Sequence, residues 1–333
     1  MMGKRVLVTG AGGFIGHHLV SALRRSGHWV RGVDLKFPEY EATAANEFHQ
    51  LDLRREDACR RSVEGVDEIY HLAADMGGIG YITSNHATIA HNNTLIDINM
   101  LEASAAARVG RFLYASSACV YPAYRQTQAN VDPLREDDAY PADPDEAYGW
   151  EKLYSERLCN HYSHDFGLDT RIVRLHNVYG PLGTYDGGRE KAPAAMCRKV
   201  ARACDGGEIE IWGDGEQTRS FMYVDDGVEG LQRIMHANCS LPINLGTERL
   251  ISINELVDIV ANCAGKRIRK RYNPSGPQGV RGRNSDSQRL RTVTGWEPTT
   301  SLEVGLARTY AWIAEQTGVA HEQVRLSRTP APA

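Results

Sequence analysis

Short apolar runs alternate with longer amphipathic segments along most of the chain. Four of the runs have the length and content of buried strands: residues 4–9, 29–33, 69–74 and 170–175. In segments between them, such as residues 17–25 and 92–108, apolar side chains recur with the period of a helix. The alternation contains no internal repeat and no interdomain linker, so we predict an α/β protein with one large domain or two intertwined ones.

The first predicted strand runs into a glycine-rich turn, Gly10-Ala-Gly-Gly-Phe-Ile-Gly16, and then into a helix. Glycines at this place allow a sharp turn and a close approach to a pyrophosphate, which binds N–H groups at the helix start. The second strand ends at Asp34, 18 residues after Gly16, where an acid binds an adenosine ribose 2′-hydroxyl. Because Asp34 repels a 2′-phosphate, we predict NAD rather than NADP, although Lys36 weakens this preference. A surface carboxylate at a strand end is the simpler alternative.

A predicted strand that begins at Arg111 ends in two serines and a cysteine, Ser116, Ser117 and Cys119. The end of such a strand opens into the ligand crevice of an α/β protein, where serines can hydrogen-bond a sugar hydroxyl or a carbonyl oxygen. A thiol there becomes a base or nucleophile if its surroundings favour the thiolate. The alternative is a buried thiol beside two turn serines. The glycine turn upstream and a Tyr-x-x-x-Lys motif downstream favour the functional interpretation.

That motif, Tyr148-Gly-Trp-Glu-Lys152, begins a helix predicted to continue through Tyr162. Residues four apart share a helix face, so Lys152 lies beside Tyr148. A free phenol has a pKa of about 10, and an adjacent ammonium favours the phenolate. Tyr148 is therefore a candidate base for a sugar hydroxyl proton. A tyrosine and a lysine on a solvated helix face are the alternative.

Composition limits the function classes further. A hydrophobic content of 42% with 24% charged residues indicates a folded protein, and the net charge of −4 favours no nucleic-acid partner. No apolar run reaches membrane-spanning length, and the start runs directly into a strand, so we expect a cytoplasmic protein without a signal peptide or membrane partner. The seven cysteines include no pair with metal-ligand spacing, so we expect reduced thiols and no metal. Apart from Cys119, they are interpreted as packing residues.

The C-terminal half offers weaker signals. We predict a helix that begins near Lys191 and continues through Lys199, a hairpin-like segment at residues 209–221 and a strand at 242–247. Ser252-Ile-Asn-Glu255 has the pattern of a capping box before an apolar helix. In the glycine-rich loop of residues 276–286, Arg281 and Arg283 suit a diphosphate and a solvated basic turn equally well.

The Gly-x-x-Gly-x-x-Gly spacing of the first turn, with the motifs above, resembles the extended short-chain dehydrogenase/reductase family. Within it the chain is similar, over nearly its whole length, to the GDP-mannose 3,5-epimerases. Six motifs carry this resemblance: Ala74-Asp-Met-Gly-Gly, Ser84-Asn-His, Ala115-Ser-Ser-Ala-Cys119-Val-Tyr-Pro, Gly187-Gly-Arg-Glu-Lys-Ala-Pro-Ala-Ala, Trp212-Gly-Asp-Gly-x-Gln-Thr-Arg-Ser-Phe and Gly279-Val-Arg-Gly-Arg-Asn-Ser-Asp. The related 4,6-dehydratases usually carry Thr-x-Glu where this chain has Ser117-Ala-Cys119, and ordinary 4-epimerases usually have Thr in place of Cys119.

The resemblance implies a Rossmann-like doubly wound parallel sheet that binds NAD and a smaller, mainly C-terminal domain that binds a nucleotide sugar. We expect the NAD-binding domain at residues 1–175 and roughly 222–247, the sugar-nucleotide domain at 176–221 and 248–325, and a loose tail at 326–333. A homodimer is also implied. The implied activity is that of an isomerase with tightly bound NAD, most simply acting on GDP-mannose at C3, C5 or both through a 4-keto intermediate.

The resemblance also implies roles for individual residues. Ser117, Tyr148 and Lys152 would form the redox triad, and Cys119 and Lys191 the acid–base pair for inversion. The cofactor would contact Gly10, Gly13, Phe14, Ile15, Gly16, Asp34, Asp52, Leu72, Tyr148 and Lys152. The sugar nucleotide would contact Gly77, Ser117, Cys119, Asn177, Glu190, Lys191, Ala192, Lys199, Gln217, Arg219, and Arg281 or Arg283.

Two alternatives stay open at this point. One is another sugar-nucleotide enzyme on the same fold, a 4-epimerase or a 4,6-dehydratase. The other is a non-catalytic NAD-binding sensor, which has no need of Tyr148, Lys152 and Cys119 together.

Overall fold

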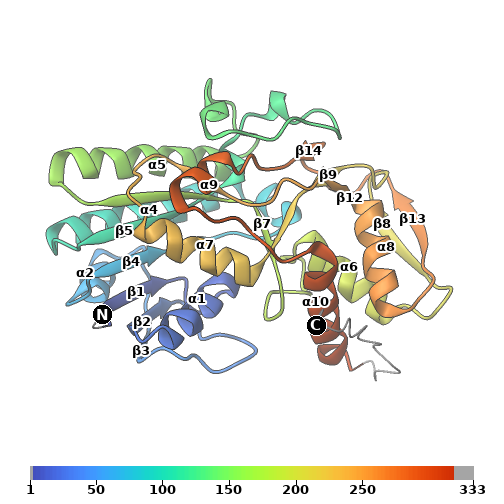
Figure 1. Cartoon of the computed structure of the whole chain (residues 1–333), viewed down its shortest axis with the longest axis horizontal. Coiled ribbons are helices and arrows are strands. Elements are labelled where there is room, and N and C mark those ends of the chain that lie inside the picture. The colour runs from blue at the N-terminus through green and yellow to red at the C-terminus, as the bar shows by residue number, and fades with distance from the viewer. Residues whose placement is uncertain (1–2, 319–333) are drawn as a thin grey trace, which may run out of the picture.

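The computed structural model describes residues 3–318 of the 333-residue chain. Its centre is a seven-stranded parallel sheet in the order β11-β6-β5-β4-β1-β2-β3 (Figure 1). The strands are β1 Arg5–Thr9, β2 Trp29–Asp34, β3 Glu47–Gln50, β4 Glu68–His71, β5 Arg111–Ser117, β6 Thr170–Leu175 and β11 Ile243–Leu245. The strand order reverses between β1 and β4, so this is the predicted doubly wound sheet, with a ligand crevice at the reversal.

Helices cover both faces of this sheet because alternate strand residues point to opposite sides. Val6 and Val8 of β1 pack with α1 Phe14–Arg25 and α7 Val224–His236, whereas Leu7 packs with α2 Glu56–Val63, α4 His86–Ala106 and α5 Ala147–Phe166. Burial on both faces explains why these strands are continuous apolar runs rather than alternating ones. Two helices begin earlier in the structure than the sequence predicted: α1 by three residues and α4 by six.

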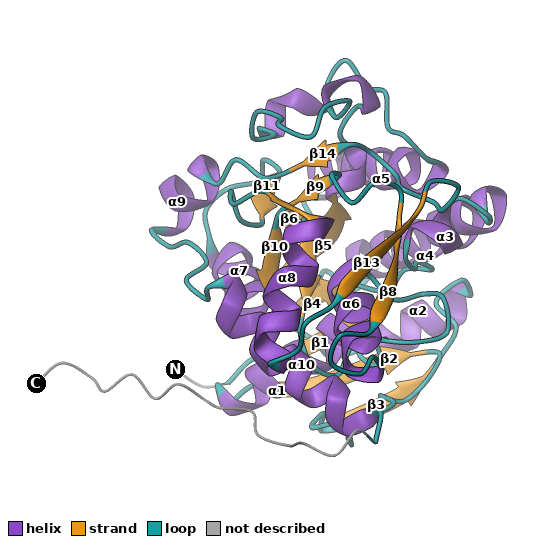
Figure 2. Ribbon diagram, turned by 90° about the vertical axis from the view of Figure 1, so that its right-hand side faces the viewer, coloured by secondary structure: helices purple, strands orange, loops and turns teal. Residues whose placement is uncertain are grey.

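Most of the remaining elements lie beyond the carboxyl edge of the sheet, where α6, α8 and α10 pack together (Figure 2). The helices here are α3 Ile79–Ile82, α6 Ala192–Arg202, α8 Ile253–Ala264 and α10 Leu302–Gln316, whereas α9 Gln288–Thr294 packs against α7 and the edge strand β11 of the central sheet. The strands are β7 Asn177–Tyr179, β8 Glu208–Trp212, β9 Thr218–Arg219, β10 Phe221–Tyr223, β12 Ile251–Ser252, β13 Arg269–Asn273 and β14 Gly282–Arg283. Ser252 and Glu255 form the predicted capping box, with reciprocal hydrogen bonds of 3.0 and 2.7 Å.

The hairpin predicted within residues 209–221 is wrong. β8 pairs in parallel with β13, and β9 pairs with β12 and β14, so neither strand pairs with the other. The apolar pattern identified strands here, but their partners come from residues more than 30 positions later in the chain. The Rossmann-type and C-terminal elements also share one continuous apolar cluster, from β1 and α1 to α8 and α10. The two parts are therefore packed as one body, and the predicted domain boundaries stay a prediction.

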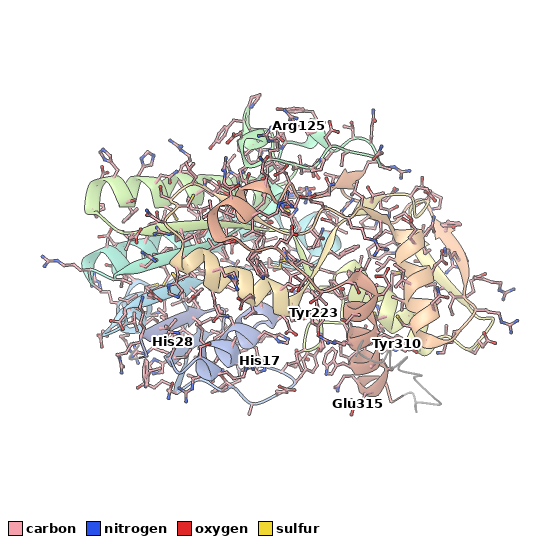
Figure 3. The ribbon with its side chains drawn as sticks, in the orientation of Figure 1. His17, His28, Arg125, Tyr223, Tyr310 and Glu315 are labelled. Carbon is pink, nitrogen blue, oxygen red and sulfur yellow. The ribbon has the colours of Figure 1, made fainter. Side chains whose placement is uncertain are left out.

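The junction between the two parts is tightly packed. Tyr179 and Tyr223 lie edge to face with ring centres 5.8 Å apart, and Gly305 of α10 leaves no room for a Cβ atom against the Tyr179 hydroxyl. Tyr223 lies between α7 and α10 in Figure 3. Within the described chain no helix has both the length and the apolar content of a membrane span. The tail predicted at residues 326–333 lies outside the described residues.

Candidate active site

The carboxyl ends of β1 and β2 form the predicted cofactor site. Gly10 has a positive φ of 71°, which suits glycine, and a Cβ on Gly16 would lie 2.1 Å from the Gly10 carbonyl oxygen. No side chain caps the N-terminus of α1 at Gly13 in the structure as described. The first-turn N–H groups, which include those of Phe14 and Ile15, are therefore directed at any anion that binds there. The geometry fits the pyrophosphate of a dinucleotide.

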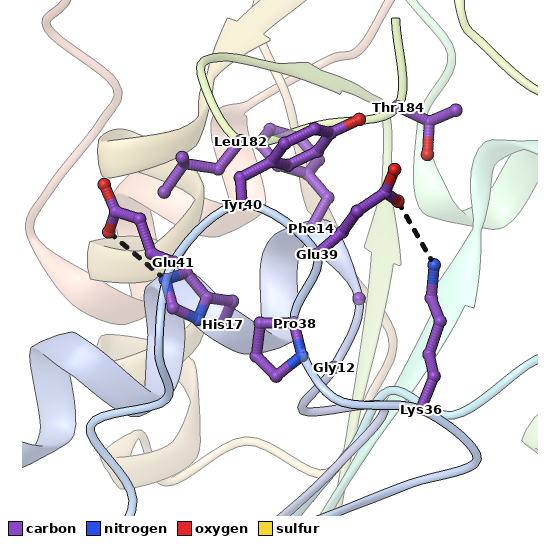
Figure 4. Close-up of a pocket in the computed structure, with 11 residues that line it drawn as sticks. Gly12, Phe14, His17, Lys36, Pro38, Glu39, Tyr40, Glu41, Leu182 and Thr184 are labelled. Atoms are coloured by element: carbon purple, nitrogen blue, oxygen red, sulfur yellow. Dashed lines mark ion pairs between the residues drawn. The ribbon is translucent and has the colours of Figure 1, made fainter. Parts of the chain in front are cut away.

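Asp34 lies next to this turn, as predicted from its spacing. Its carboxylate accepts hydrogen bonds from the N–H groups of Gly12 and Lys36, at 3.0 and 3.2 Å. The Lys36 side chain forms an ion pair with Glu39 at 3.7 Å, which offsets the charge that weakened the preference for NAD. Figure 4 shows the loop of residues 36–41 folded over the turn, with Glu39 and Tyr40 above Phe14.

The other two predicted cofactor contacts are placed differently. Leu72 follows β4, and its N–H donates to the Thr9 hydroxyl at 3.2 Å, beside the glycine turn. The Asp52 carboxylate is instead held by the Arg54 guanidinium at 2.6 Å, which lowers the pKa of Asp52. A role for Asp52 in binding adenine stays a prediction, and its carboxylate already has a cationic partner.

A large open cleft lies beyond the carboxyl ends of β5 and β6, with an empty volume of about 1660 Å³. Twelve of the predicted catalytic and substrate residues line it: Gly77, Ser117, Cys119, Tyr148, Asn177, Glu190, Lys191, Ala192, Lys199, Gln217, Arg219 and Arg283. These residues come from both parts of the chain. The tertiary structure therefore brings together almost the whole predicted site; Lys152 and Arg281 do not line the cleft.

Tyr148 and Ser117 lie where β5 meets the start of α5. Gly149 makes the close contact possible, because a Cβ there would lie 2.1 Å from the Cys119 carbonyl oxygen. Burial raises the pKa of the Tyr148 phenol, whereas Lys152 and a hydrogen bond with Ser117 oppose the rise. Lys152 does not contact the Tyr148 hydroxyl directly: its Nζ lies 5.8 Å from the Tyr148 ring centre and donates to the Tyr114 hydroxyl at 3.0 Å.

Cys119 has a cationic neighbour that the sequence did not indicate. Arg283 Nη1 lies 3.5 Å from the Cys119 sulfur, although the residues are 164 positions apart. The buried Gln126 amide orients this guanidinium by accepting a hydrogen bond from Arg283 Nε. This contact gives the Cys119 sulfur a charged hydrogen-bond donor inside the cleft. Gln126 belongs to a loop segment in which no motif identifies it.

Lys191 faces the same cleft from the opposite part of the chain, at the N-cap of α6. Burial lowers the pKa of its ammonium, and the charge of Cys119 acts in the opposite direction. No carboxylate among residues 3–318 lies within ion-pair distance of Lys191. The backbone N–H of Gly78 donates to the Arg189 carbonyl at 3.0 Å, so the loop after β4 anchors the segment that carries Lys191.

The two arginines of the glycine-rich loop are separated by the fold. Arg281 forms a bidentate pair with Asp214, at 2.7 and 2.9 Å, outside the cleft, whereas Arg283 lies inside it. Arg219 offers a second cation in the cleft: it donates to the Val280 carbonyl at 2.6 Å and has no carboxylate partner in the described chain. Burial and the nearby Arg283 lower the pKa of Arg219. An anionic ligand would stabilise the charged form of this guanidinium.

Several predicted ligands are already held by other residues. Glu190 accepts from Arg198 at 2.8 Å, Lys199 donates to the Glu210 carbonyl at 2.7 Å, and Asn177 donates to the Ser220 carbonyl at 3.1 Å. Gln217 donates to the Trp212 carbonyl at 2.9 Å, and its buried Oε1 has no partner within the described residues.

Of the other six cysteines, Cys59, Cys159 and Cys197 are buried, and Cys239 and Cys263 pack against the core. Cys204 is exposed, so its interpretation as a packing residue is wrong. Cleft-lining residues that sequence reasoning missed include Met76, Ile79, His176 and Trp212. They are apolar or singly placed residues, and only their position at the carboxyl edge distinguishes them.

The chain is similar to known proteins over most of its length. A family model described as the NAD dependent epimerase/dehydratase family matches residues 6–246. The chain is 49% identical over 314 residues to GDP-mannose 3,5-epimerase 1 of Oryza sativa subsp. japonica, covering 94% of this chain and 82% of the relative. The Arabidopsis thaliana GDP-mannose 3,5-epimerase is 48% identical with the same coverage.

Solved structures are similar over the same length. A UDP-glucose 4-epimerase from Thermotoga maritima with UDP-glucose has a TM-score of 0.85 at 28% identity, covering 94% of this chain and 99% of the other. A UDP-glucuronic acid 4-epimerase from Bacillus cereus, with UDP-glucuronic acid and NAD, has a TM-score of 0.81 at 27% identity and the same coverage. The similarity therefore extends over both parts of the chain.

Proposed function

Because the chain belongs to the NAD dependent epimerase/dehydratase family, we propose that it is an isomerase which inverts C3, C5 or both in GDP-D-mannose, giving GDP-L-galactose or GDP-L-gulose. The observation that carries this proposal is the meeting of Cys119, Tyr148 and Lys191 in one cleft. The high identity to relatives named GDP-mannose 3,5-epimerases supports the substrate.

The two unpaired guanidiniums of the cleft, Arg219 and Arg283, are the proposed contacts of the diphosphate and the sugar. Planar guanidinium groups match phosphate oxygens with paired hydrogen bonds. Arg281 is the weaker choice because Asp214 already occupies both of its terminal nitrogens. The free Oε1 of Gln217 would accept a hydrogen bond from the nucleotide or the sugar.

Oxidation at C4 begins with Tyr148, which takes the C4 hydroxyl proton as a general base. NAD, when bound at the glycine turn and Asp34, supplies the hydride acceptor and later the donor, so that the cofactor ends each turnover unchanged. Ser117 would hold the C4 oxygen, and the Lys152 ammonium would favour loss of the Tyr148 proton. The resulting 4-ketone acidifies the hydrogens on C3 and C5.

Inversion then requires one group to remove a proton and another to return one on the opposite face. Cys119 extends from the sheet and Lys191 from the N-cap of α6, so the two come from different parts of the chain. An ammonium also stabilises the enolate that forms when C3 or C5 loses its hydrogen. A 4-epimerase has no need of this pair, and a 4,6-dehydratase usually has a glutamate where this chain has Cys119, which is why we place them second. A non-catalytic sensor is the third possibility.

The function is tested by incubating the purified protein with GDP-mannose in deuterated water, without added NAD. We expect new GDP-hexoses with deuterium at C3, C5 or both, identified by NMR. Turnover without added cofactor is expected because the net reaction is redox-neutral and the loop of residues 36–41 folds over the NAD site. A stoichiometric requirement for NAD or NADPH would contradict the recycling of the cofactor. Products changed only at C4, or dehydrated at C6, would point to the alternative enzymes.

We also propose a cytoplasmic homodimer that associates through the outer surface of α4 and α5. Trp150 and Tyr154 of α5 are 50% and 51% exposed, and Leu95 of α4 is 36% exposed. Large apolar side chains grouped on neighbouring helices are typical of an interface. We expect Trp150→Glu to shift the protein from dimer to monomer in sedimentation velocity, whereas Trp212→Glu, a change at another exposed tryptophan, does not. A monomeric wild type would contradict the dimer.

A further inference from the structure

A series of buried polar side chains connects the glycine turn to Lys152 behind the cleft. The Thr9 hydroxyl oxygen accepts the two backbone N–H groups that follow β4, at 3.2 Å each, and lies 2.8 Å from His71 Nδ1. Its proton is therefore free to donate to Nδ1. His71 Nε2 then carries the ring proton and donates it to Asp97 Oδ1 at 3.0 Å.

On its other side, the Asp97 carboxylate faces Tyr114 and Lys152. The Tyr114 hydroxyl donates to Asp97 Oδ2 at 2.8 Å and accepts from Lys152 Nζ at 3.0 Å. Lys152 is 2% exposed, and its Nζ lies 3.8 Å from Asp97 Oδ2. The carboxylate of Asp97 thus faces three donors: an imidazole, a phenol and an ammonium.

A second buried carboxyl group lies beside the same ammonium. Glu151 Oε1 is 3.7 Å from Lys152 Nζ, and this carboxyl group also faces the carboxyl group of Asp97. Asn93 Nδ2 donates to Oε2 at 3.2 Å, and the Ser155 hydroxyl donates to Oε1 at 3.4 Å. Glu151 is 5% exposed and Asp97 is fully buried.

One ammonium balances only one of these two carboxylates. Two ionised carboxyl groups around one buried cation would leave an uncompensated negative charge, which is costly in a low-dielectric interior. The usual outcome is that one carboxyl group keeps its proton. Asp97, with its three donors, is better suited to carry the charge than Glu151, which has two neutral donors.

We propose that Asp97 is the ionised counter-ion of Lys152, and that Glu151 beside it is a neutral carboxylic acid. Asp97 is a positioning residue, because it acts on the reaction only through the lysine, whereas the neutral Glu151 carries no charge that the lysine needs. The directions of the pKa shifts agree with this arrangement. Burial raises the pKa of Glu151 against the effect of Lys152, with Asp97 adding to the rise, while Lys152 and His71 hold the pKa of Asp97 low although burial opposes them.

This arrangement extends the proposed function. The assignment of charges is independent of that function, and only its effect on the reaction rate rests on the proposed function. Burial alone would lower the pKa of the Lys152 ammonium, but the charge of Asp97 raises it. Lys152 therefore remains a fixed positive charge at neutral pH, close to the Tyr148 ring. The charge that favours loss of the Tyr148 proton depends in this way on a residue of α4.

The first test measures the proton on Glu151 directly and needs no substrate. Infrared difference spectra of the wild type and Glu151→Gln are recorded at neutral pH in deuterated buffer. We expect a carboxylic-acid carbonyl band in the wild type that is absent from Glu151→Gln. If the difference contains only carboxylate bands, Glu151 is ionised and the proposal is wrong. This result stands whether or not the protein epimerises GDP-mannose.

The second test compares matched carboxyl-to-amide changes. Glu151→Gln replaces one neutral group by another and should retain kcat with an unchanged pH profile. In Asp97→Asn the buried ammonium of Lys152 loses its ionised counter-ion, so the pKa of Lys152 falls and the alkaline limb of kcat should move to lower pH. One unit above the lowered pKa of Lys152, kcat should be roughly tenfold lower, because only about one molecule in ten still carries the ammonium charge.

The double variant Asp97→Asn with Glu151→Gln removes both carboxyl groups beside Lys152, so its alkaline limb should lie at a pH at least as low as that of Asp97→Asn. A Glu151→Gln profile shifted as far as that of Asp97→Asn would overturn the assignment. If Asp97→Asn does not fold, the infrared comparison decides alone. The titratable groups that face this pair from all packed elements are His71, Asp97, Tyr114, Tyr148, Glu151, Lys152 and Cys159.

Discussion

Tyr148→Phe is expected to abolish the first chemical step while leaving the fold intact. The phenol is the proposed acceptor of the C4 hydroxyl proton, and removal of such a group typically reduces rates by about 10²–10⁴-fold. Because inversion depends on the 4-ketone, three signals should fall together: NADH absorbance, solvent deuterium in the sugar and product formation. The change removes one oxygen atom from a side chain that is 5% exposed, so substrate affinity should be retained.

Tyr272→Phe is the matched control for this experiment. Tyr272 lies on β13, is 45% exposed and does not line the cleft. Its variant should behave as the wild type in all three measurements. If Tyr148→Phe forms product at a near-normal rate, Tyr148 is not the base. Loss of NAD binding by the variant would instead indicate a structural role.

Cys119→Ala and Lys191→Ala, made separately, are each expected to stop inversion without stopping oxidation. General acid–base groups contribute about 10²–10⁴-fold, so epimer formation should fall by this factor in each variant. Tyr148 and Lys152 remain in both proteins, so GDP-mannose should still reduce bound NAD⁺, which is measured as growth of NADH absorbance. The 4-keto sugar should then accumulate.

Deuterium exchange separates the two roles. A variant that lacks the base should incorporate no deuterium at C3 or C5 in deuterated water. A variant that lacks only the acid can lose the proton and recover it on the same face, so it should exchange without inverting. Cys204→Ala and Lys270→Ala are the controls. Cys204 is exposed, and Lys270, which lies on β13 away from the cleft, pairs with Asp258.

Two outcomes would contradict this two-group assignment. Normal epimerisation by either variant would show that a water molecule or another residue replaces the missing group. Complete loss of NAD reduction in both variants, to the level of Tyr148→Phe, would place Cys119 and Lys191 in substrate binding or oxidation instead. In the second case the contact between Arg283 and Cys119 would be reinterpreted as part of the binding site.

Local pattern was sufficient for the cofactor half of the molecule. The strand–turn–helix of Gly10 to Gly16 and the acid at Asp34 are close in sequence and in space, so spacing alone predicted their geometry. The capping box at Ser252 and Glu255 was predictable for the same reason. Ser117 and Tyr148 were found because strand ends and the first turn of a helix are where parallel sheets place their reactive groups.

Contacts between residues that lie far apart along the chain could not be predicted from the sequence. The glycine-rich loop supported Arg281 and Arg283 equally, and only the fold separated them, pairing one with Asp214 and placing the other beside Cys119. The hairpin prediction failed because β8 and β9 have strand propensity but find partners in β13, β12 and β14. Strand propensity identifies a strand without identifying its neighbour.

The sequence by itself determined the cofactor turn, because its chemistry lies within one short segment. Through its resemblance to a known family the sequence also implied the doubly wound sheet and the identity of most cleft residues. The tertiary structure decided which charges meet. It places Lys152 against Asp97, Tyr114 and Glu151 rather than against the Tyr148 hydroxyl, and it places Cys119 and Lys191 in one cleft from two parts of the chain. Electrostatic interactions act through space, so the protonation of these groups depends on neighbours that lie far away along the chain.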